Sequence, residues 1–294
     1  MDANAIKLNE VLAGHCTYRI GGAAKCYFCA AGEDEVVAGL EVARENGFPF
    51  FILGGGSNVL FSDEGFPGLV LKMENNSIKS RDDGDKDTLI VGAGTPLAAL
   101  VKFAYDHSLT GMEWAAGIPG TVGGAIRGNA GAFHREMGEA VVKVRALKVN
   151  SGDIESQIFP KANCDFSYRD SIFKREKSLV VVSAALSLAK GDAAAIKSEM
   201  DEYLLKKTTT QPLDHPSAGS VFANPPGFFA GKIIEDCGFK GKVVGGAQVS
   251  EKHANFIINR GDAKALDVKE LIGQIKIAAK EKFGVEMKEE IEVI

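Results

Sequence analysis

Apolar residues recur along the chain with two different periods, and each period predicts its own kind of element. Recurrence every three to four positions predicts amphipathic helices over 33–47, 96–107, 192–207, 229–237 and 262–283. Shorter apolar runs bounded by glycine or polar residues predict strands over 49–53, 68–73, 87–91, 140–150, 178–188, 256–259 and 289–294. Helices and strands are mixed without strict alternation, which indicates α+β domains rather than one doubly wound sheet.

The segment TTTQPLDHP at 208–216 interrupts this pattern. Proline cannot continue a helix, so we predict that the preceding helix ends at residue 207 and that a domain boundary follows. A chain of 294 residues has room for two or three domains.

Composition narrows the class of protein. Apolar residues make up 45% and charged residues 25% of the chain, as in soluble globular proteins. The net charge of −5 argues against a general binder of nucleic acid or membranes. No apolar stretch approaches the roughly 18 residues that span a bilayer, and the N-terminus lacks the pattern of a secretory signal. We therefore expect a cytoplasmic protein.

Five cysteines are present, and Cys26 and Cys29 among them form a C-x-x-C. This spacing occurs in redox pairs and in half of a zinc site. No second C-x-x-C and no spaced pair of histidines completes a metal site. We interpret the two cysteines as half-buried positions in or beside a strand, and we expect no metal.

Glycine is the outlier of the composition, with 34 residues. One cluster, Gly54-Gly55-Gly56-Ser57-Asn58, follows a predicted strand, and a second lies within WAAGIPGTVGGAIRGNAGAF at 114–133. Glycine permits positive φ and brings bare backbone amides to an anion. The clusters therefore predict a pyrophosphate-bearing cofactor. Neither cluster has the dinucleotide-binding G-x-G-x-x-G spacing, and the chain contains no P-loop.

The two clusters and seven further motifs resemble the UDP-N-acetylenolpyruvoylglucosamine reductase family, also called UDP-N-acetylmuramate dehydrogenases. The resemblance covers nearly the whole chain, in the order of the family. The further motifs are TYRIGG at 17–22, DEGFPGLVL at 63–71, YRDSIF at 168–173, PSAGSVFANP at 216–225, AGKIIEDCGFKG at 230–241, GGAQVSEKHANFIIN at 245–259 and FGVEMKEEIEV at 283–293.

The resemblance implies an FAD-binding fold of the vanillyl-alcohol-oxidase (PCMH) type, with two α+β subdomains and a C-terminal α+β substrate-binding domain. We place FAD-binding subdomain 1 at residues 1–75, joined by the C-terminal strand 285–294. Subdomain 2 is placed at 76–207 and the substrate-binding domain at 208–284.

The resemblance also implies the reaction. NADPH gives a hydride to noncovalent FAD, and a hydride then passes to the vinyl terminus of UDP-N-acetylglucosamine enolpyruvate. Protonation of the neighbouring carbon completes UDP-N-acetylmuramate, a precursor of peptidoglycan and the cell wall. Charge develops beside the substrate carboxylate, so this chemistry needs a fixed cation there and a proton donor. We expect the protein to act as a monomer.

Three residues match the family's catalytic positions. Arg169 matches the arginine that grips the carboxylate; outside this motif it would be an ordinary surface ion pair. Ser220 matches the proton donor; outside the motif it would be a turn or N-cap serine. Glu290 matches the catalytic glutamate, in preference to Glu289, because strand alternation sends the two side chains to opposite faces.

Further positions carry over from the family as binding residues. The expected FAD contacts are Gly54, Gly55, Gly56, Ser57, Asn58, Gly117, Gly120, Thr121, Gly123, Gly124, Asn129 and Gly131. The expected substrate contacts are Tyr168, Gln211, Asn224 and Lys232. His253 is left open between a ligand contact and a hydrogen-bonded histidine beside a strand.

The sequence departs from the family at two positions that often carry a cation for the diphosphate. Thr210 stands before Gln-Pro, and Ala223 follows Ser-Val-Phe. Lys206 or Lys207 are candidates to compensate. One branch of the family inserts a loop with a substrate-clamping tyrosine between the YRDS and catalytic-serine motifs. This chain has one strand, one helix and the proline-rich break there, so we place it in the shorter branch.

Two other functions remain open from the residues. One is an FAD-dependent oxidoreductase of the same superfamily with a different substrate, often with flavin attached through His or Cys. Neither glycine cluster contains such a residue. The other is a flavin-binding protein without catalysis, against which the joint presence of Arg169, Ser220 and Glu290 argues.

Overall fold

The computed structural model describes residues 6–294, which group into two units. The first unit contains the described residues 6–7, 26–55 and 68–206. The second contains residues 8–25, 56–67 and 207–294. The expected domains at 1–75 with 285–294, 76–207 and 208–284 remain a prediction.

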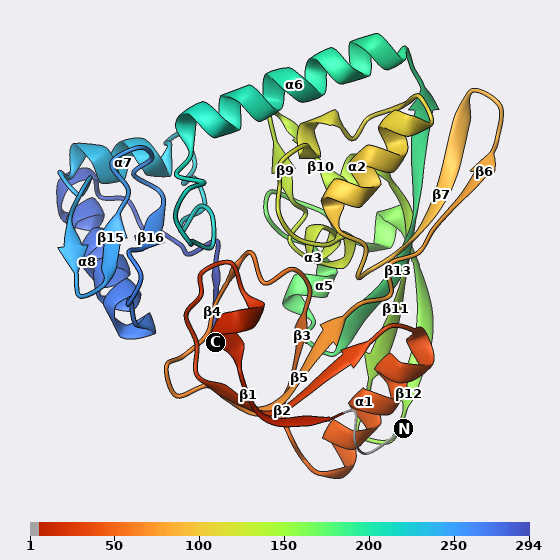
Figure 1. Ribbon diagram of the computed structural model, residues 1–294, viewed down its shortest axis with the longest axis horizontal. Coiled ribbons are helices and arrows are strands. Elements are labelled where there is room, and N and C mark those ends of the chain that lie inside the picture. Colours follow the sequence, from red (N-terminus) through yellow and green to blue (C-terminus); the bar gives the residue numbers. More distant parts are fainter. Residues whose placement is uncertain (1–5) are drawn as a thin grey trace. The chain divides into compact units, whose positions relative to one another are not determined.

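One sheet of the first unit consists of six antiparallel strands. Their order is β12-β11-β13-β7-β6, and β8 pairs with the end of β13. Figure 1 shows the long β11 and β13 side by side, with the β6–β7 hairpin beyond them. The bounds are β6 (Ile78–Asp82), β7 (Lys86–Gly92), β8 (Leu109–Thr110), β11 (Val141–Val149), β12 (Ile154–Pro160) and β13 (Leu179–Lys190).

A second group of strands lies in the order β2-β5-β3, where β2 spans Ala23–Ala30, β5 Phe66–Met73 and β3 Phe50–Leu53. β3 and β5 are parallel, and the connection from β2 to β3 contains a helix, α1 (Glu33–Glu45). α1 buries Val36, Leu40 and Ala43 at helical spacing, as its pattern predicts.

The remaining elements of the first unit are short except for α2. They are α2 (Leu97–Asp106), η3 (Glu113–Ala115), α3 (Val122–Arg127), β9 (Gly131–Ala132), β10 (Arg135–Glu136), α4 (Met137–Ala140), η4 (Lys161–Asn163) and α5 (Ile172–Arg175). One buried core joins α1, both sheets and these helices, through residues such as Leu40, Leu71, Val91, Ile126 and Val182. The glycine-rich region is thus anchored on apolar residues within it.

The helix α6 (Ala193–Thr210) is longer than the sequence predicts. The expected end at residue 207 is wrong, because Thr208, Thr209 and Thr210 continue the helix and Pro212 follows it. Threonine has a modest helix propensity, but one helix turn of it is tolerated when the next proline lies outside the helix. The chain passes from the first unit to the second at Lys206–Lys207, inside α6.

The second unit is a smaller mixture of strands and helices. β14, β15 and β16 form an antiparallel sheet, and β17 pairs in parallel with β4. The bounds are β1 (Lys7–Val11), η2 (Leu12–His15), β4 (Val59–Leu60), α7 (Ala230–Asp236), β14 (Val243–Val244), β15 (Ala247–Val249), β16 (Ile257–Asn259), α8 (Ala265–Phe283) and β17 (Glu292–Val293).

Helix α8 shows how distant residues fix an element of this unit. It buries Val268, Leu271 and Ile275 along one stripe. The Asp63 carboxylate accepts from the first amides of the helix, those of Ala265 at 2.8 Å and Leu266 at 3.2 Å. At the other end, Gly284 adopts the left-handed conformation that closes a helix, with φ 67°.

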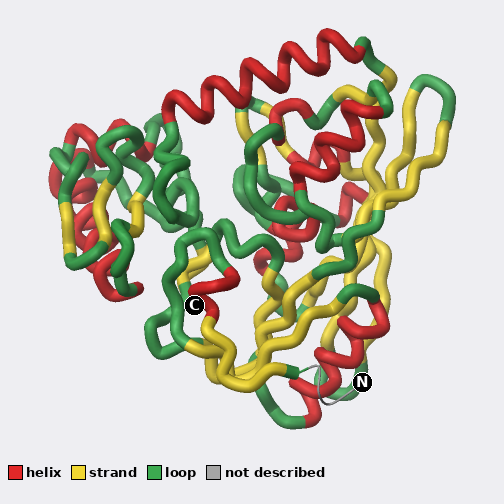
Figure 2. The backbone as a smooth tube through the Cα atoms, viewed as in Figure 1, coloured by secondary structure: helices red, strands yellow, loops and turns green. Residues whose placement is uncertain are grey.

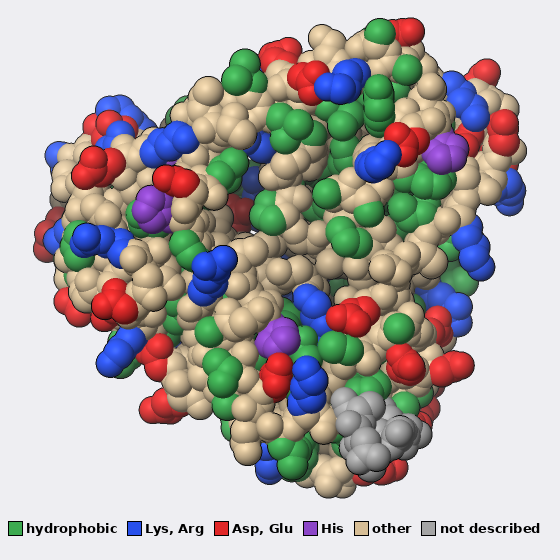
Figure 3. Space-filling model, in the orientation of Figure 1, with side chains coloured by type: hydrophobic (Ala, Val, Ile, Leu, Met, Phe, Trp, Pro, Cys, Tyr) green, Lys and Arg blue, Asp and Glu red, His purple; other side chains and the backbone are tan. Residues whose placement is uncertain are grey.

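Charged side chains of both signs are interspersed on the face drawn in Figure 3. In the first unit, strands form the sheets and loops join the short helices (Figure 2). Among residues 6–294, no helix is long and apolar enough to cross a membrane.

Candidate functional site

The structure brings the two glycine clusters into direct contact within the first unit. A Cβ atom placed on Gly55 would lie 2.6 Å from the Cα of Gly120. A Cβ on Gly54 would lie 2.5 Å from Oγ1 of Thr121. Glycine at 54 and 55 is therefore required by the neighbouring loop, in addition to any ligand that approaches the backbone.

The second cluster turns sharply before it enters α3. Gly117 and Gly120 adopt positive φ values of 72° and 121°, which favour glycine. Thr121 then caps α3, and the amide of Gly123 donates to the carbonyl of Ala93 at 2.8 Å. A Cβ on Gly123 would lie 2.8 Å from that of Ala93. The cluster is thus held closely against β7 and α2.

Lys72 is a polar residue of this region that the sequence analysis missed. It lies in β5, an otherwise apolar strand, and its Nζ donates to the carbonyl of Gly54. Burial lowers the pKa of the Lys72 amine below its usual range. The lysine inside the apolar run GLVLKM is the sequence signal that could have identified it.

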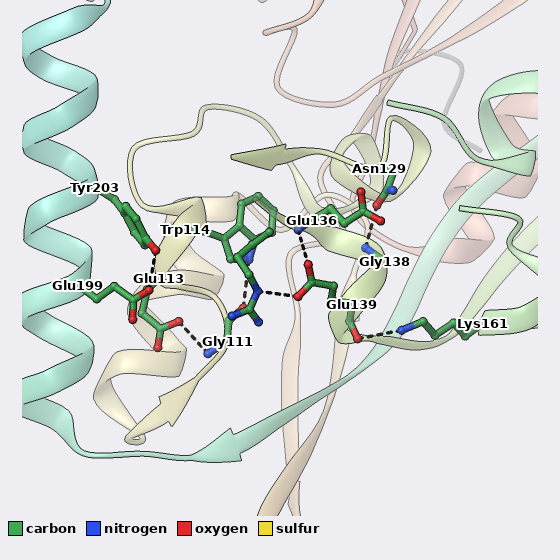
Figure 4. A network of polar contacts seen from close by, with 11 residues as sticks. Gly111, Glu113, Trp114, Asn129, Glu136, Gly138, Glu139, Lys161, Glu199 and Tyr203 are labelled. Carbon is green, nitrogen blue, oxygen red and sulfur yellow. Dashed lines mark hydrogen bonds and ion pairs between the residues drawn. The ribbon is translucent and has the colours of Figure 1, made fainter. Parts of the chain in front are cut away.

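Asn129 serves the fold with its side chain. It is fully buried, its Nδ2 donates to the carbonyl of Ser167 at 2.9 Å, and its Oδ1 accepts from the amide of Gly138 at 2.9 Å. Figure 4 shows this contact to Gly138. The bond to Ser167 ties the end of the glycine-rich segment to the turn that carries Tyr168 and Arg169.

Arg169 lies at the tip of a tight turn. The amide and carbonyl of Ser167 pair with those of Asp170 at 3.1 Å each, which leaves only Tyr168 and Arg169 between them. Arg169 has a φ of 57°, a left-handed value that is strained for arginine. Strained residues of this kind are frequent at functional sites.

The half-buried Arg169 side chain is held from several directions. Its Nη2 donates to the carbonyl of Gly131 at 2.8 Å, and its guanidinium carbon lies 5.3 Å from the ring centroid of Tyr168. Lys174 donates to the Arg169 carbonyl at 2.9 Å. Tyr168 itself is 53% exposed, which leaves its ring accessible.

In the second unit, Ser220 begins an extended segment held on both sides. Ser220 bridges to Phe256, and the buried Asn255 side chain bonds both the amide and the carbonyl of Phe222, at 3.0 and 2.8 Å. On the other side, the amide of Glu290 donates to the carbonyl of Val221 at 2.8 Å. The structure therefore places Ser220 and Glu290 on neighbouring, hydrogen-bonded segments.

Glu289 and Glu290 differ in their surroundings. The Glu289 carboxylate pairs with Nζ of Lys276 on α8, at 2.9 and 3.0 Å. The backbone of Glu290 is bound differently: its carbonyl accepts a hydrogen bond from Nδ2 of Asn58 at 3.1 Å. The carbonyl of Asn58 in turn accepts from the amide of Glu292. The last residue of the first glycine cluster thus lies beside the segment that carries Glu290.

The expected substrate contacts have other partners in the structure. Oδ1 of Asn224 accepts from the amide of Ala230 at 2.9 Å and so caps α7. Lys232 pairs with Asp236 one turn further along α7, at 2.6 Å. Gln211 lies just after α6, and its amide donates to the carbonyl of Lys207. Any substrate that binds Lys232 must compete with Asp236.

His253 is a hydrogen-bonded residue beside β16. Its Nδ1 accepts from the amide of Asn255 at 3.3 Å, and its ring meets the edge of Phe256 with centroids 4.9 Å apart. Burial, with a smaller contribution from Lys240, lowers the pKa of the imidazole. The imidazole therefore favours its neutral form in the folded protein.

The five cysteines are all free thiols. Cys26 is buried and Cys29 half-buried in β2, three positions apart, so strand alternation sends them to opposite faces. Over residues 6–294, no group of three or more His, Cys, Asp or Glu side chains is arranged to hold a metal ion.

The chemistry of the two glycine clusters suits a diphosphate group. Neither 54–58 nor 117–131 contains an acidic residue, and the Lys72 amine lies behind Gly54. Closely spaced glycine amides favour phosphate oxygens. Residues 54–55 and 117–124, which all lie in the first unit, therefore fit the pyrophosphate of FAD.

Two protein-family models match parts of the chain. The FAD binding domain matches residues 24–156, which include both glycine clusters. The C-terminal domain of UDP-N-acetylenolpyruvoylglucosamine reductase matches residues 211–294, which include Ser220 and Glu290.

Curated relatives match almost the entire chain. A UDP-N-acetylenolpyruvoylglucosamine reductase of Caldanaerobacter subterraneus subsp. tengcongensis is 44% identical, over 98% of this chain and 93% of the relative. One of Clostridium novyi is 40% identical, over 100% of this chain and 94% of the relative.

Solved structures support the expected fold class. UDP-N-acetylenolpyruvylglucosamine reductase from Thermus caldophilus superposes with a TM-score of 0.82 at 33% identity, over 98% of both chains. Cholesterol oxidase from B. sterolicum matches 64% of this chain and 38% of its own, with a TM-score of 0.51 at 17% identity, which concerns the fold alone. The predicted α+β, PCMH-type FAD-binding fold is confirmed.

Replacing Gly55 by alanine tests the contact between the two glycine clusters. The new Cβ would lie 2.6 Å from Gly120, so we expect the affinity for FAD to fall at least about tenfold. The ratio of flavin to protein absorbance and the Kd for FAD measure this effect. Gly128→Ala is the matched control, because its Cβ would meet only the carbonyl of Gly124 at 3.6 Å. Equal flavin binding by both variants would contradict the prediction.

The buried His253 predicts a pH dependence of stability. Its lowered pKa means that the unfolded chain takes up a proton that the folded chain excludes. The free energy of unfolding should therefore fall as pH drops below about 6.5, the ordinary histidine value. Urea unfolding of His253→Gln should show a flatter pH dependence than that of the wild type. Identical slopes for wild type and His253→Gln would refute this assignment.

Proposed function

Because the chain belongs to the UDP-N-acetylenolpyruvoylglucosamine reductase family, we propose that it reduces UDP-N-acetylglucosamine enolpyruvate to UDP-N-acetylmuramate, a peptidoglycan precursor. NADPH is the hydride donor, and FAD, when bound, carries the hydride from NADPH to the substrate. The family model for FAD binding and the fit of residues 54–55 and 117–124 to a pyrophosphate support this cofactor.

The reaction leaves one carbon of the substrate to be protonated. Hydride addition to the CH₂ terminus of the enolpyruvyl ether gives a methyl group, and negative charge spreads from the adjacent carbon onto the carboxylate. A proton delivered to that carbon completes the lactyl ether. The protein must therefore stabilise the carboxylate and supply a proton.

Arg169 is the residue that we assign to the carboxylate. A guanidinium stays charged at all relevant pH values and offers two parallel N–H groups to a carboxylate. The strained backbone at Arg169 and the hydrogen bond to Gly131 support a side chain held in one direction before substrate arrives. Such preorganisation lowers the cost of stabilising developing charge.

Ser220 is the residue that we assign as proton donor, with Glu290 as its neighbour. The observation that carries this assignment is the hydrogen bond between the Glu290 amide and the Val221 carbonyl, one residue after Ser220. Asn255 braces the same segment at Phe222. A serine is a weak acid, so it needs a second group to replace its proton, and Glu290 is suited to this.

The interval between the YRDS motif and Ser220 supports the shorter branch of the family. It contains the expected strand and helix, β13 and α6, and one short helix that the sequence did not predict, α5; no further helix or strand lies between α6 and Ser220 in the described chain. Lys206 was a candidate to replace the diphosphate-binding cation that Thr210 lacks. Its amine instead pairs with Glu202 at 2.5 Å. Lys207 is buried, and burial lowers its pKa to about 8.

We place the enzyme in the cytoplasm as a monomer without nucleic-acid or membrane partners. The free thiols, the net charge of −5 and the mixed surface charge of the face in Figure 3 support this placement. Peptidoglycan precursors of this kind serve cell-wall growth and division.

An anaerobic two-step experiment tests the proposed function. The purified holoenzyme is reduced with one equivalent of NADPH, and UDP-N-acetylglucosamine enolpyruvate is then added while the flavin absorbance is followed. Prompt reoxidation is expected. Flavin that is reduced but stays reduced would refute the substrate and favour another oxidoreductase of the same superfamily. Release of the flavin on denaturation is expected for noncovalent FAD.

Ser220→Ala should separate the two half-reactions. We expect flavin reduction by NADPH to be unchanged and reoxidation by substrate to slow by about 10²–10⁴-fold, the usual contribution of a general acid. Stopped-flow absorbance measures both steps in one instrument. Wild-type reoxidation would show that Ser220 is not the proton donor.

Adjacent glutamates provide a matched pair for Glu290. Glu290→Gln should slow reoxidation by about 10²-fold because the proton relay is interrupted. Glu289→Gln should lose only its ion pair with Lys276, worth about 1 kcal/mol or less at a partly exposed site. The same absorbance trace and a thermal unfolding curve distinguish the two variants. A slow Glu289→Gln beside a normal Glu290→Gln would reverse the assignment.

A further inference from the structure

The β9–β10 hairpin has an unfavourable turn. Its strands pair Ala132 with Arg135 and Gly131 with Glu136, so Phe133 and His134 form the two-residue turn. Both have positive φ, 52° and 63°. Turns of this type normally use Asn or Gly at these positions, because larger side chains are strained there. Contacts outside the turn must therefore stabilise it.

An aromatic stack on α6 supplies such contacts. The ring of Phe133 stacks on that of Tyr203, with centroids 4.2 Å apart and an interplanar angle of 12°. Nζ of Lys206 lies 5.7 Å from the Phe133 centroid and 5.8 Å from that of Tyr203. One ring comes from the hairpin turn, and the other ring and the cation come from α6; both segments belong to the first unit.

The stack is itself fixed along α6. The hydroxyl of Tyr203 donates to Glu199 at 2.7 Å, a contact visible in Figure 4, and Lys206 pairs with Glu202. Each is a contact between residues four positions apart on one helix face. Tyr203 and Lys206 on α6 therefore present a preformed surface to Phe133.

The other end of the hairpin contacts Arg169. The carbonyl of Gly131 accepts from Nη2 of Arg169 at 2.8 Å. A Cβ on Gly131 would lie 3.2 Å from Nη1 of the same side chain, so the hairpin backbone packs closely against the guanidinium. Only one residue, Ala132, separates Gly131 from Phe133, whose ring is stacked.

We propose that Phe133, Tyr203 and Lys206 are positioning residues for the reduction step. The stack holds the strained hairpin in place, and the Gly131 carbonyl then fixes the direction of the Arg169 guanidinium. None of the three needs to touch the substrate for this role. The inference rests on the carboxylate-binding role assigned to Arg169 under the proposed function.

Substitution of Tyr203 tests the inference. In the FAD-loaded protein, Tyr203→Leu should reduce the limiting rate of flavin reoxidation by substrate roughly tenfold, because small misplacements of catalytic groups are costly. Flavin reduction by NADPH should stay at the wild-type rate. The substrate Kd, read from the perturbation of the oxidised flavin spectrum, should change less than about threefold. This split between rate and binding distinguishes positioning from a general loss of structure.

Three variants serve as controls. Tyr203→Phe keeps the ring and should restore the wild-type limiting rate, and Glu199→Gln, which weakens only the hydroxyl contact, should behave similarly. Lys197→Ala removes an exposed ion pair with Asp201 on the same helix and should have no effect. A double-mutant cycle of Phe133→Leu and Tyr203→Leu should be non-additive, because the two rings act as one unit.

Arg169→Lys separates failure of the inference from failure of the proposed function. If Arg169→Lys slows reoxidation and Tyr203→Leu matches wild type, the positioning role is overturned while the assignment of Arg169 stands. If Arg169→Lys also matches wild type, the assignment of Arg169 fails and this inference with it. A Tyr203→Phe variant as slow as Tyr203→Leu would equally overturn the role of the stack.

Discussion

The close approach of Gly55 to Gly120 is the constraint on which the cofactor region depends. With 2.6 Å between a hypothetical Cβ at Gly55 and the Gly120 backbone, no other residue fits without moving a loop. This contact aligns the end of β3 with the start of α3, and Thr121 takes part in both by contacting Gly54 and capping α3. A sequence rich in glycine thus specifies a unique contact between two backbones rather than flexibility.

Asparagine side chains hold backbone segments near the glycine clusters in the first unit and, separately, near Ser220 in the second. Asn129 links the second cluster to Ser167, and Asn255 braces the segment after Ser220. Asn75 similarly bonds the Gly94 amide and the Val182 carbonyl, at 2.7 Å each. Each asparagine satisfies backbone groups that would otherwise be buried without a partner, so replacing it costs more than one ordinary hydrogen bond.

The sequence predicted the elements that carry strong apolar periodicity, such as α1, α8 and β13. It missed β6 and β12, because these sheet strands are mostly exposed and polar and show no apolar run. It missed α3 because glycine and proline obscure the helical period. The site motifs were recognised as sequence patterns, but long-range contacts were not. The lysine behind Gly54 and the capping of α8 by Asp63 join residues far apart in the chain.

Two identical neighbours illustrate what only the structure adds. Strand alternation predicts that Glu289 and Glu290 face opposite directions, but it cannot say which carboxylate is available for chemistry. The structure pairs Glu289 with Lys276, a partner thirteen positions earlier on α8. The ion pair with α8 gives Glu289 a structural role, and the chemical role of Glu290 stays a proposal.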